Sequence, residues 1–312
     1  MALSSSAFRQ LSRILSFSRA MKCVWPSYAT LLQRRSISSK DDILQLQYLE
    51  GDDKGIAVIG MNRPEAMNAF SRQLGQKIEE AVEAVKFDKN VRVLILRSLV
   101  PGVFCAGADL KERAKMSEKE VAPFVAKGRK MMNDFHEMPV PVIAALDGVA
   151  AGGGLEIAMA CDFRIAADNA KMGLTECRLG IIPGGGCTLS PGGTQRLARI
   201  IGPSKAKELI FTAKLVYGDE AAKIGLVNYS VPQNDTKDAA YQRSLELARE
   251  ILPNGPIGVQ MAKQAINKGS EVDLASGLAF EGAFYAQTIP TKDRMEALIA
   301  FREKRKPVFK GE

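Results

Sequence analysis

The chain has 312 residues, of which 46% are hydrophobic and 25% charged, and it carries a formal net charge of +8. This composition is typical of a globular protein, and no apolar run approaches the roughly 20 residues that cross a bilayer, which excludes a membrane-spanning helix. The positive charge gathers at one end, because residues 1–40 hold several Arg and Lys and no Asp or Glu. The rest of the chain is close to neutral, which argues against nucleic-acid binding as its main function.

Residues 1–40 have the composition of a mitochondrial presequence. They are rich in Ser and Arg, and apolar side chains recur at helical spacing from Phe8 to Phe17. A secretory signal needs an uninterrupted apolar stretch, which the recurring arginines break. We therefore expect this segment to direct the protein to the mitochondrial matrix and to be removed; a disordered basic tail is the alternative.

Strands alternating with helices predict an α/β core after this segment. In chain order we expect strands over 43–50 and 55–62, a helix over 71–87, a strand over 91–98, a helix over 117–133, and strands over 142–148 and 163–167. The turn-like GDDK between the first two strands predicts an antiparallel pair. The later alternation indicates a layered sheet covered by helices.

Beyond Thr194 the pattern becomes helical. Amphipathic periodicity predicts helices over 194–201, 204–212, 238–252 and 257–269, followed by a long pair that ends at Lys306. We place a boundary near residue 240, between an α/β core of residues 41–240 and a C-terminal helical segment of residues 241–312.

Metal and thiol chemistry find no support in the sequence. The five cysteines form no C-x-x-C pair and have no histidine at metal-ligand spacing, so neither a zinc site nor a disulfide framework is predicted. We interpret the single histidine, His136, as structural or surface-exposed. Chemistry must then rest on carboxylates, backbone amides or lysines.

The stretch AAGGGLEIAMACD places three glycines directly before a glutamate and an apolar, helix-prone run. Gly152, Gly153 and Gly154 precede a helix start, where outward-facing amides and the helix dipole can hold an anion. Glycine there lets a ligand approach the backbone closely. The structural alternative is a tight turn, with Glu156 in the first helical turn because the dipole favours it.

A second stretch, VFCAGADLKE, also runs from a strand through small residues to a helix start. Asp109 and Glu112 are spaced as in a capping box, so a well-capped helix is the structural alternative. Ala106, Gly107 and Ala108 are small enough to leave their amides open to a ligand. Two such loops could present two N–H groups to one oxygen, an arrangement worth a rate factor of about 10² to 10³ for each donor.

Glu176 lies between an apolar run and a proline-glycine loop in KMGLTECRLGIIPGG. If the fold brings it beside Glu156, one carboxylate can take a proton from water while the other delivers a proton to carbon. Burial and mutual repulsion would separate the two pKa values. Sequence spacing leaves open the alternative that Glu176 is a solvated loop residue.

The stretches VFCAGADLKE, GVAAGGGLEIAMACD, MGLTE, IIPGG and GGTQRL, in that order, resemble the enoyl-CoA hydratase/isomerase (crotonase) superfamily. The resemblance covers the chain after the presequence. It implies an α/β fold of the crotonase type, a spiral of ββα units with a C-terminal helical trimerisation segment, assembled as a homotrimer or homohexamer. It also implies an acyl-CoA substrate and no metal or redox cofactor, since coenzyme A is part of the substrate.

The resemblance also implies roles by position. Ala108 and Gly153 correspond to the oxyanion-hole amides, and Glu156 and Glu176 to the catalytic carboxylates. The residues that it implies for substrate binding are Ala106, Gly107, Asp109, Leu110, Lys111 and Gly152, with Asn62, Asn68 and Ala69 near the pantetheine and adenine end.

The implied reaction is the addition of water across the 2,3 double bond of an enoyl-CoA. Two glutamates favour a hydratase, because isomerases of the family commonly lack the glutamate after the glycines. Stretches such as PGVFCAGADLKERAKMS and EVDLASGLA resemble mitochondrial members that act on 3-methylglutaconyl-CoA in leucine degradation; the mitochondrial enoyl-CoA hydratase domain-containing proteins are the nearest competing group. A general short-chain enoyl-CoA hydratase of fatty-acid β-oxidation and an enoyl-CoA isomerase remain alternatives.

RNA binding is a further, disfavoured alternative. An RNA-binding relative presents a row of lysines on the helix that matches residues 71–88. This chain has Gln76 and Glu80 at matching positions and adds Glu79 and Glu83. Phosphate binding needs an uninterrupted positive face, which these residues break.

Relatives have IPGGGGTQRL where this chain has IPGGGCTLSPGGTQRL, so a segment around Cys187–Pro191 is inserted after the Glu176 loop. A genuine insertion could loosen the site, where a displacement of 1 Å can cost about 10²-fold in rate. The alternative is a splice or gene-model error, because Cys-Thr-Leu-Ser-Pro before Gly can be encoded by a pyrimidine-rich stretch ending in CAG, as introns end.

Overall fold

The computed structural model describes residues 42–184 and 192–312. The predicted presequence and the predicted insert around Cys187–Pro191 lie outside the described residues. In the described part, the strands belong to a larger sheet of six strands and a smaller sheet of four.

The larger sheet is mostly parallel. Its order is β1 (Leu44–Tyr48), β2 (Ile56–Met61), β3 (Val93–Ser98), β5 (Val142–Leu146), β7 (Phe163–Ala167) and β10 (Tyr229–Val231). The first two strands are antiparallel, as the sequence predicts, and each later pair is parallel. β2 and β5 are buried along their whole length, because helices cover both faces of the sheet.

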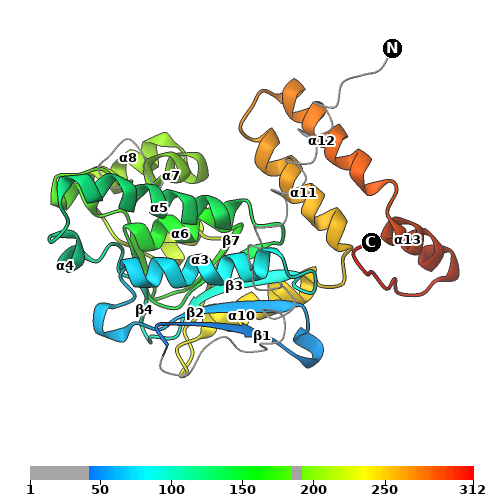
Figure 1. The fold of residues 1–312 in the computed structure, drawn as a ribbon, viewed down its shortest axis with the longest axis horizontal. Helices are drawn as coiled ribbons and strands as arrows, with labels where there is room; N and C mark the ends of the chain where they lie inside the picture. Colours follow the sequence, from blue (N-terminus) through cyan, green and yellow to red (C-terminus); the bar gives the residue numbers. More distant parts are fainter. Residues whose placement is uncertain (1–41, 185–191) are drawn as a thin grey trace, which may run out of the picture. The chain divides into compact units, whose positions relative to one another are not determined.

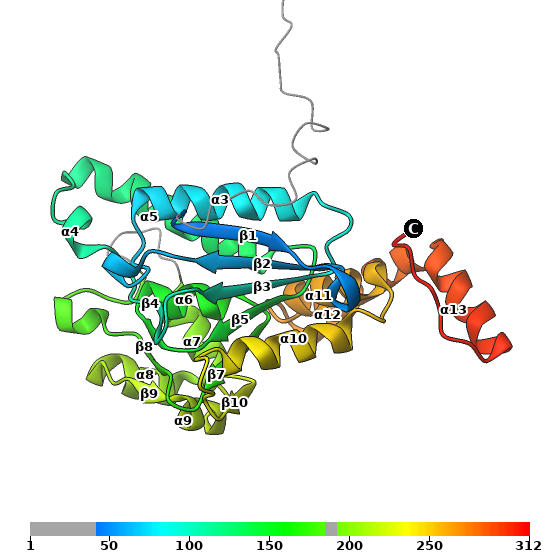
Figure 2. The same cartoon turned by 90° about the horizontal axis from the view of Figure 1, so that it is seen from below.

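Neighbouring side chains along the strand β2 enter two different cores. Ile59 packs with the apolar stripes of α3 (Arg72–Lys86) and α5 (Glu118–His136). Val58, one residue earlier and pointing to the opposite face, packs with α10 (Ala239–Ile251). Figure 2 shows α3 and α10 on opposite sides of the sheet.

The smaller sheet reveals a structural repeat. Its strands are β4 (Val103–Cys105), β6 (Val149–Ala151), β8 (Lys171–Gly173) and β9 (Val216–Tyr217), in that order. Each of the first three follows a long strand of the larger sheet and precedes a helix: α4 (Leu110–Arg113), α6 (Gly153–Ala160) and the 3-10 helix η4 (Glu176–Leu179). This confirms the predicted spiral of ββα units. The strand predicted at the start of VFCAGADLKE is β4, whereas β6 and β8 were not predicted, because three residues carry no periodicity.

The remaining elements of the described residues are two short 3-10 helices and six helices of the second half of the chain (Figure 1). They are the 3-10 helices η2 (Gly51–Asp53) and η3 (Pro64–Ala66), and the helices α7 (Gly193–Ile201), α8 (Pro203–Thr212), α9 (Gly218–Lys223), α11 (Pro256–Gly269), α12 (Leu274–Thr288) and α13 (Lys292–Glu303). None of the helices in the described part is both long and apolar enough to cross a membrane.

The predicted boundary of the C-terminal helical segment lies at a helix that packs on the larger sheet. The boundary near residue 240 falls at the start of α10, yet Leu245 and Ala248 of that helix pack on the larger sheet. The helices that leave the sheet are α11, α12 and α13. α11 and α12 lie side by side (Figure 1), and large apolar side chains such as Leu274 and Phe301 are 78% and 86% exposed.

Two cations hold α11 and the end of α10 against the α/β core. The buried Lys263 Nζ donates to Val140 O at 3.0 Å and pairs with Asp162 Oδ2 at 2.7 Å. Arg92 donates to the carbonyls of Leu252 and Asn254, where α10 ends.

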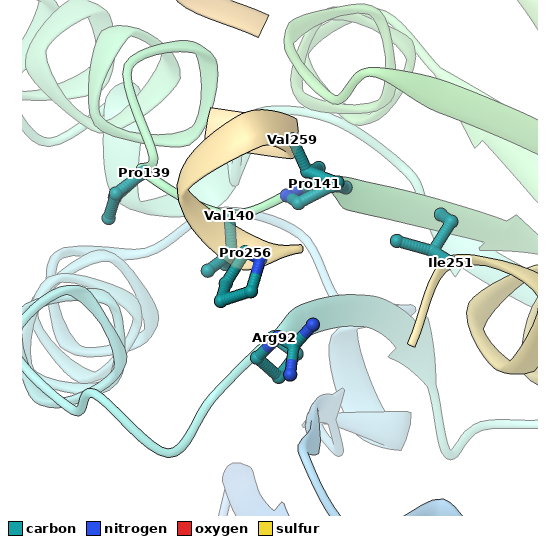
Figure 3. Close-up of a pocket in the computed structure, with 7 residues that line it drawn as sticks. All are labelled: Arg92, Pro139, Val140, Pro141, Ile251, Pro256 and Val259. Atoms are coloured by element: carbon teal, nitrogen blue, oxygen red, sulfur yellow. The ribbon is translucent and has the colours of Figure 1, made fainter. Parts of the chain in front are cut away.

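A small pocket lies at the same junction, and Figure 3 shows Pro139, Pro141, Pro256 and Val259 among its lining residues. Arg92 also lines this pocket. None of the residues predicted to carry chemistry lines it, so we interpret it as a packing defect at a structural junction.

Candidate active site

Three short parallel strands bring the predicted catalytic segments together. β4 ends at Cys105 before the Ala106–Asp109 loop, β6 ends at Ala151 before the glycines, and β8 ends at Gly173 shortly before Glu176. The sheet order is β4-β6-β8, and neighbouring parallel strands end at the same edge. The carboxyl ends of parallel strands are the usual place for a ligand site.

The peptide of Ala108 is presented by a pairing between two loops. Phe70 and Ala108 form an isolated parallel bridge, in which Phe70 N–H donates to Gly107 O at 2.7 Å and Asp109 N–H donates to Phe70 O at 3.1 Å. In a parallel bridge the hydrogen bonds are made by the residues on either side of Ala108, here Gly107 and Asp109. The N–H of Ala108 itself therefore points away from Phe70.

The N–H of Gly153 opens α6 and lies beside that loop. The first N–H groups of a helix have no partner within the helix. A β-carbon on Gly107 would lie 3.3 Å from the Gly153 nitrogen and 2.8 Å from Ala151 O, and Gly107 has φ +96°, so only glycine fits there. Among the described residues, neither Ala108 N–H nor Gly153 N–H donates a backbone hydrogen bond. Two free amides therefore lie at adjacent loops.

Glu156 is buried in the first turn of α6. The residue is only 2% exposed, and its Oε1 accepts a hydrogen bond from Gly193 N–H at 2.9 Å. Burial and then the charge of Glu176 raise the pKa of Glu156 to about 7, against the opposing effects of Gly193 N–H and Arg196. Glu156 can therefore hold or release a proton near neutral pH.

Glu176, at the start of η4, lies beside the start of the helix α6 that carries Glu156. A β-carbon on Gly152 would lie 2.9 Å from Glu176 Oε1, so the carboxylate rests against the glycine that precedes α6. Its other oxygen, Oε2, is buried and has no hydrogen-bond partner among the described residues. Burial raises the pKa of Glu176, while its own backbone N–H and Arg113 act in the opposite direction.

Close packing explains why Gly154 is a glycine and why the Cys105 thiol is buried. A β-carbon on Gly154 would lie 2.2 Å from Cys105 O, so α6 can approach β4 only with glycine at this position. The Cys105 thiol donates to Asn68 O at 3.0 Å, and burial raises its pKa to about 12. Cys105 thus supports the loop and is too weakly acidic to serve as a nucleophile.

The predicted ligand contacts divide into two groups. Leu110 and Lys111 are exposed next to Ala108, where a ligand could reach them. The Asn68 side chain is fully buried and donates to Ser98 Oγ at 2.8 Å and Phe104 O at 3.0 Å. A side chain without exposed surface cannot touch a ligand, so the expected contact of Asn68 with pantetheine is corrected to a structural role.

Asn62, Ala69 and Asp109 are also engaged within the protein. Asn62 N–H donates to Ile43 O at 2.8 Å, which ties this loop to the start of β1. Ala69 is 8% exposed, and its carbonyl accepts from Arg63 Nη1 at 2.9 Å. Asp109 Oδ1 caps α4 by accepting from the N–H groups of the next helical turn.

Three further residues near the site were not predicted from the sequence. Gly193 holds Glu156 through its N–H, Arg196 on α7 lowers the pKa of Glu156, and Arg63 pairs with Asp109 at 2.8 Å. The motif GGTQRL contains the first two, and a glycine at a helix start was the available signal for Gly193. Among the described residues, no group of three or more His, Cys, Asp and Glu side chains is arranged to hold a metal ion.

Comparisons with known proteins show which family this chain resembles in sequence and fold. A family model described as enoyl-CoA hydratase/isomerase matches residues 51–312. The chain is 54% identical over 302 residues to the human protein named methylglutaconyl-CoA hydratase, mitochondrial, covering 94% of this chain and 87% of that protein. It is 54% identical over 268 residues to human enoyl-CoA hydratase domain-containing protein 2, mitochondrial, covering 86% and 90%. A crystal structure of enoyl-CoA hydratase from Bacillus anthracis matches with TM-score 0.80 and 43% identity, covering 87% of this chain and 100% of that chain.

Proposed function

This chain belongs to the enoyl-CoA hydratase/isomerase family, and we propose that it adds water across the 2,3 double bond of an enoyl-CoA thioester, with 3-methylglutaconyl-CoA as its substrate. The observation that carries the proposal is the meeting of two carboxylates, Glu156 and Glu176, with the free amides of Ala108 and Gly153 at one sheet edge.

The two amides stabilise the charge that develops during the reaction. When a nucleophile attacks C3 of the enoyl thioester, negative charge moves to the thioester oxygen as an enolate. Ala108 N–H and Gly153 N–H donate to that oxygen, and donors fixed in advance stabilise the transition state more than the ground state. Their backbone positions are set before substrate arrives, by the bridge to Phe70 and by the start of α6.

The two glutamates move the protons. A water molecule between them loses a proton to one carboxylate as its oxygen attacks C3, and the other carboxyl group delivers a proton to C2. This requires one proton shared between the pair, which fits a pKa of about 7 for Glu156 and a raised pKa for Glu176. The pair titrates as a unit, so each apparent pKa belongs to both groups. The buried Glu176 Oε2 is an acceptor free for that water.

Hydration is favoured over double-bond migration because both carboxylates are present. An isomerase needs one base to carry a proton between two carbons, whereas addition of water needs an acceptor and a donor at once. Coenzyme A would lie along Ala106–Lys111, with exposed Lys111 available to its phosphates. The proposed reaction requires no metal or redox cofactor, since coenzyme A is part of the substrate.

The names of relatives bear on the location of the protein, and its exposed C-terminal helices bear on its assembly. Relatives named as mitochondrial support a mitochondrial protein, and we propose the matrix as its compartment. We also propose self-association through the exposed apolar side chains of α12 and α13, as a homotrimer or a homohexamer. No observation favours RNA binding, because Arg72 and Lys77 of α3 are paired with carboxylates.

The test is the substrate profile of the purified protein. Loss of the conjugated enoyl-thioester absorbance is followed with 3-methylglutaconyl-CoA and with crotonyl-CoA, and a 3-enoyl-CoA is supplied separately. We expect fast hydration with the highest kcat/KM for 3-methylglutaconyl-CoA. A higher kcat/KM for crotonyl-CoA would replace the proposed substrate by a short-chain enoyl-CoA. Migration of the double bond without uptake of water would replace the hydratase by an isomerase.

A further inference from the structure

One side of the proposed oxyanion hole is held by the loop that precedes α3. Ala106 N–H donates to Met67 O at 3.0 Å, and the bridge between Phe70 and Ala108 adds two backbone hydrogen bonds. Met67 and Asn68 both have positive φ, a conformation that non-glycine residues adopt only when surrounding contacts enforce it. The position of the Ala108 peptide therefore depends on what holds this loop.

Arg63 contacts both sides of the bridge. Its Nη1 donates to Ala69 O at 2.9 Å, directly before Phe70, and its Nη2 pairs with Asp109 Oδ2 at 2.8 Å, directly after Ala108. The side chains of Arg63 and Asp109 are only 18% and 11% exposed, so water screens the pair weakly. A planar guanidinium with two directed donors fixes the two backbones relative to each other.

Asp109 is oriented at both of its oxygens. Oδ1 accepts from Lys111 N–H and Glu112 N–H, each at 3.1 Å, while Oδ2 faces Arg63. The hydrogen bond from Glu112 N–H, followed by the bond and charge of Arg63, keeps the pKa of Asp109 below its usual value. Asp109 thus remains ionised at neutral pH and links the start of α4 to Arg63.

We propose that Arg63 and Asp109 form a positioning pair, which sets the direction of the Ala108 N–H toward the thioester oxygen without touching the substrate. The proposal rests on the proposed function, because it assigns Ala108 N–H to the oxyanion hole. It also gives Asp109 a different role from substrate binding. A shift of about 1 Å in a catalytic group can lower the rate about 10²-fold, so loss of the pair is expected to reduce kcat.

The pair is tested by Arg63→Met, Arg63→Lys and Asp109→Asn. For Arg63→Met we expect kcat to fall by about 10- to 100-fold while KM changes less than about threefold. Asp109→Asn keeps an oxygen for the α4 cap and removes the charge, so a similar fall is expected. Arg63→Lys keeps the positive charge but replaces the planar guanidinium by a compact ammonium group. We therefore expect its kcat to lie between those of the wild type and Arg63→Met. The double variant Arg63→Met/Asp109→Asn should lose no more than the larger single loss.

A spectroscopic signal separates positioning from general structural damage. Donors on the thioester oxygen polarise a conjugated enoyl chain and shift its absorbance to longer wavelength. A bound 4-(dimethylamino)cinnamoyl-CoA should show this shift in the wild type and a smaller shift per bound molecule in Arg63→Met. The matched control is Arg249→Met, which breaks the ion pair with Asp53 at 2.7 Å, away from the site loops. It is expected to keep both kcat and the full shift.

Either of two results would overturn the proposal. One is a folded Arg63→Met or Asp109→Asn variant with kcat within twofold of the wild type. The other is a fall in kcat with the absorbance shift unchanged. If Arg63→Met fails to fold, Asp109→Asn and Arg63→Lys decide the question by the same criteria. If the wild type hydrates no enoyl-CoA, the proposed function fails, yet the shift of the bound analogue still tests the pair.

Discussion

Replacing Glu156 by glutamine removes a buried charge and keeps the shape of the side chain. The pKa of Glu156 in the folded protein is about 7, against an ordinary 4.5. Folding therefore disfavours the ionised form, and at 1.36 kcal/mol per pH unit the difference amounts to about 3 kcal/mol. This penalty is fully present above pH 7, shrinks as the pH falls through 7, and is absent below 4.5.

Glutamine is neutral and can still accept the Gly193 N–H through its Oε1. We expect Glu156→Gln to be more stable than the wild type at pH 8, by up to about 3 kcal/mol, and nearly equal to it at pH 4.5. Its turnover should fall by at least about 10² because general acid–base catalysis is lost. Urea unfolding at both pH values, followed by circular dichroism, measures the first effect, and enoyl-CoA hydration measures the second. A variant less stable than the wild type at pH 8 would refute this reasoning.

The structure leads to three further predictions. The pH profile of kcat/KM should be bell-shaped with its upper limb near pH 7, since only the singly protonated pair offers a donor and an acceptor; a flat profile from pH 6 to 9 would contradict this. Gly152→Ala should lower kcat by about 10², because its β-carbon would lie 2.9 Å from Glu176 Oε1, and steady-state kinetics will show whether it does. Lys263→Met should lower the free energy of unfolding by about 3 kcal/mol by leaving Asp162 without its buried partner; unchanged urea midpoints would disprove it.

The long elements were predictable because their periodicity is strong. The antiparallel pair β1–β2, the helix α3 and the repeated helices after Thr194 all lie where the sequence predicts them. The strands β6 and β8 were not predicted, since three-residue strands are formed by pairing with distant segments. The packing of α10 on the larger sheet was not predicted, because an amphipathic pattern does not show which surface a helix covers.

The site was predictable in its residue types and less so in its connections. Glu156 and Glu176 were assigned through the resemblance of the motifs around them, because the residues alone left open a helix-start role for Glu156 and a solvated loop for Glu176. The resemblance implied that Asn68 lies near the pantetheine and adenine end of the ligand, whereas the fold buries it completely. The bond from Gly193 to Glu156 joins residues far apart in the chain, so only the three-dimensional arrangement reveals it.

The most direct test of the central claim is the product formed from 3-methylglutaconyl-CoA in water labelled with heavy oxygen. Mass spectrometry of the wild-type reaction should show one labelled hydroxyl group per molecule of product, and the Glu156→Gln/Glu176→Gln variant should form none at a measurable rate. Labelled product from that variant, or consumption of substrate by the wild type without the label, would contradict a hydratase that depends on these two carboxylates.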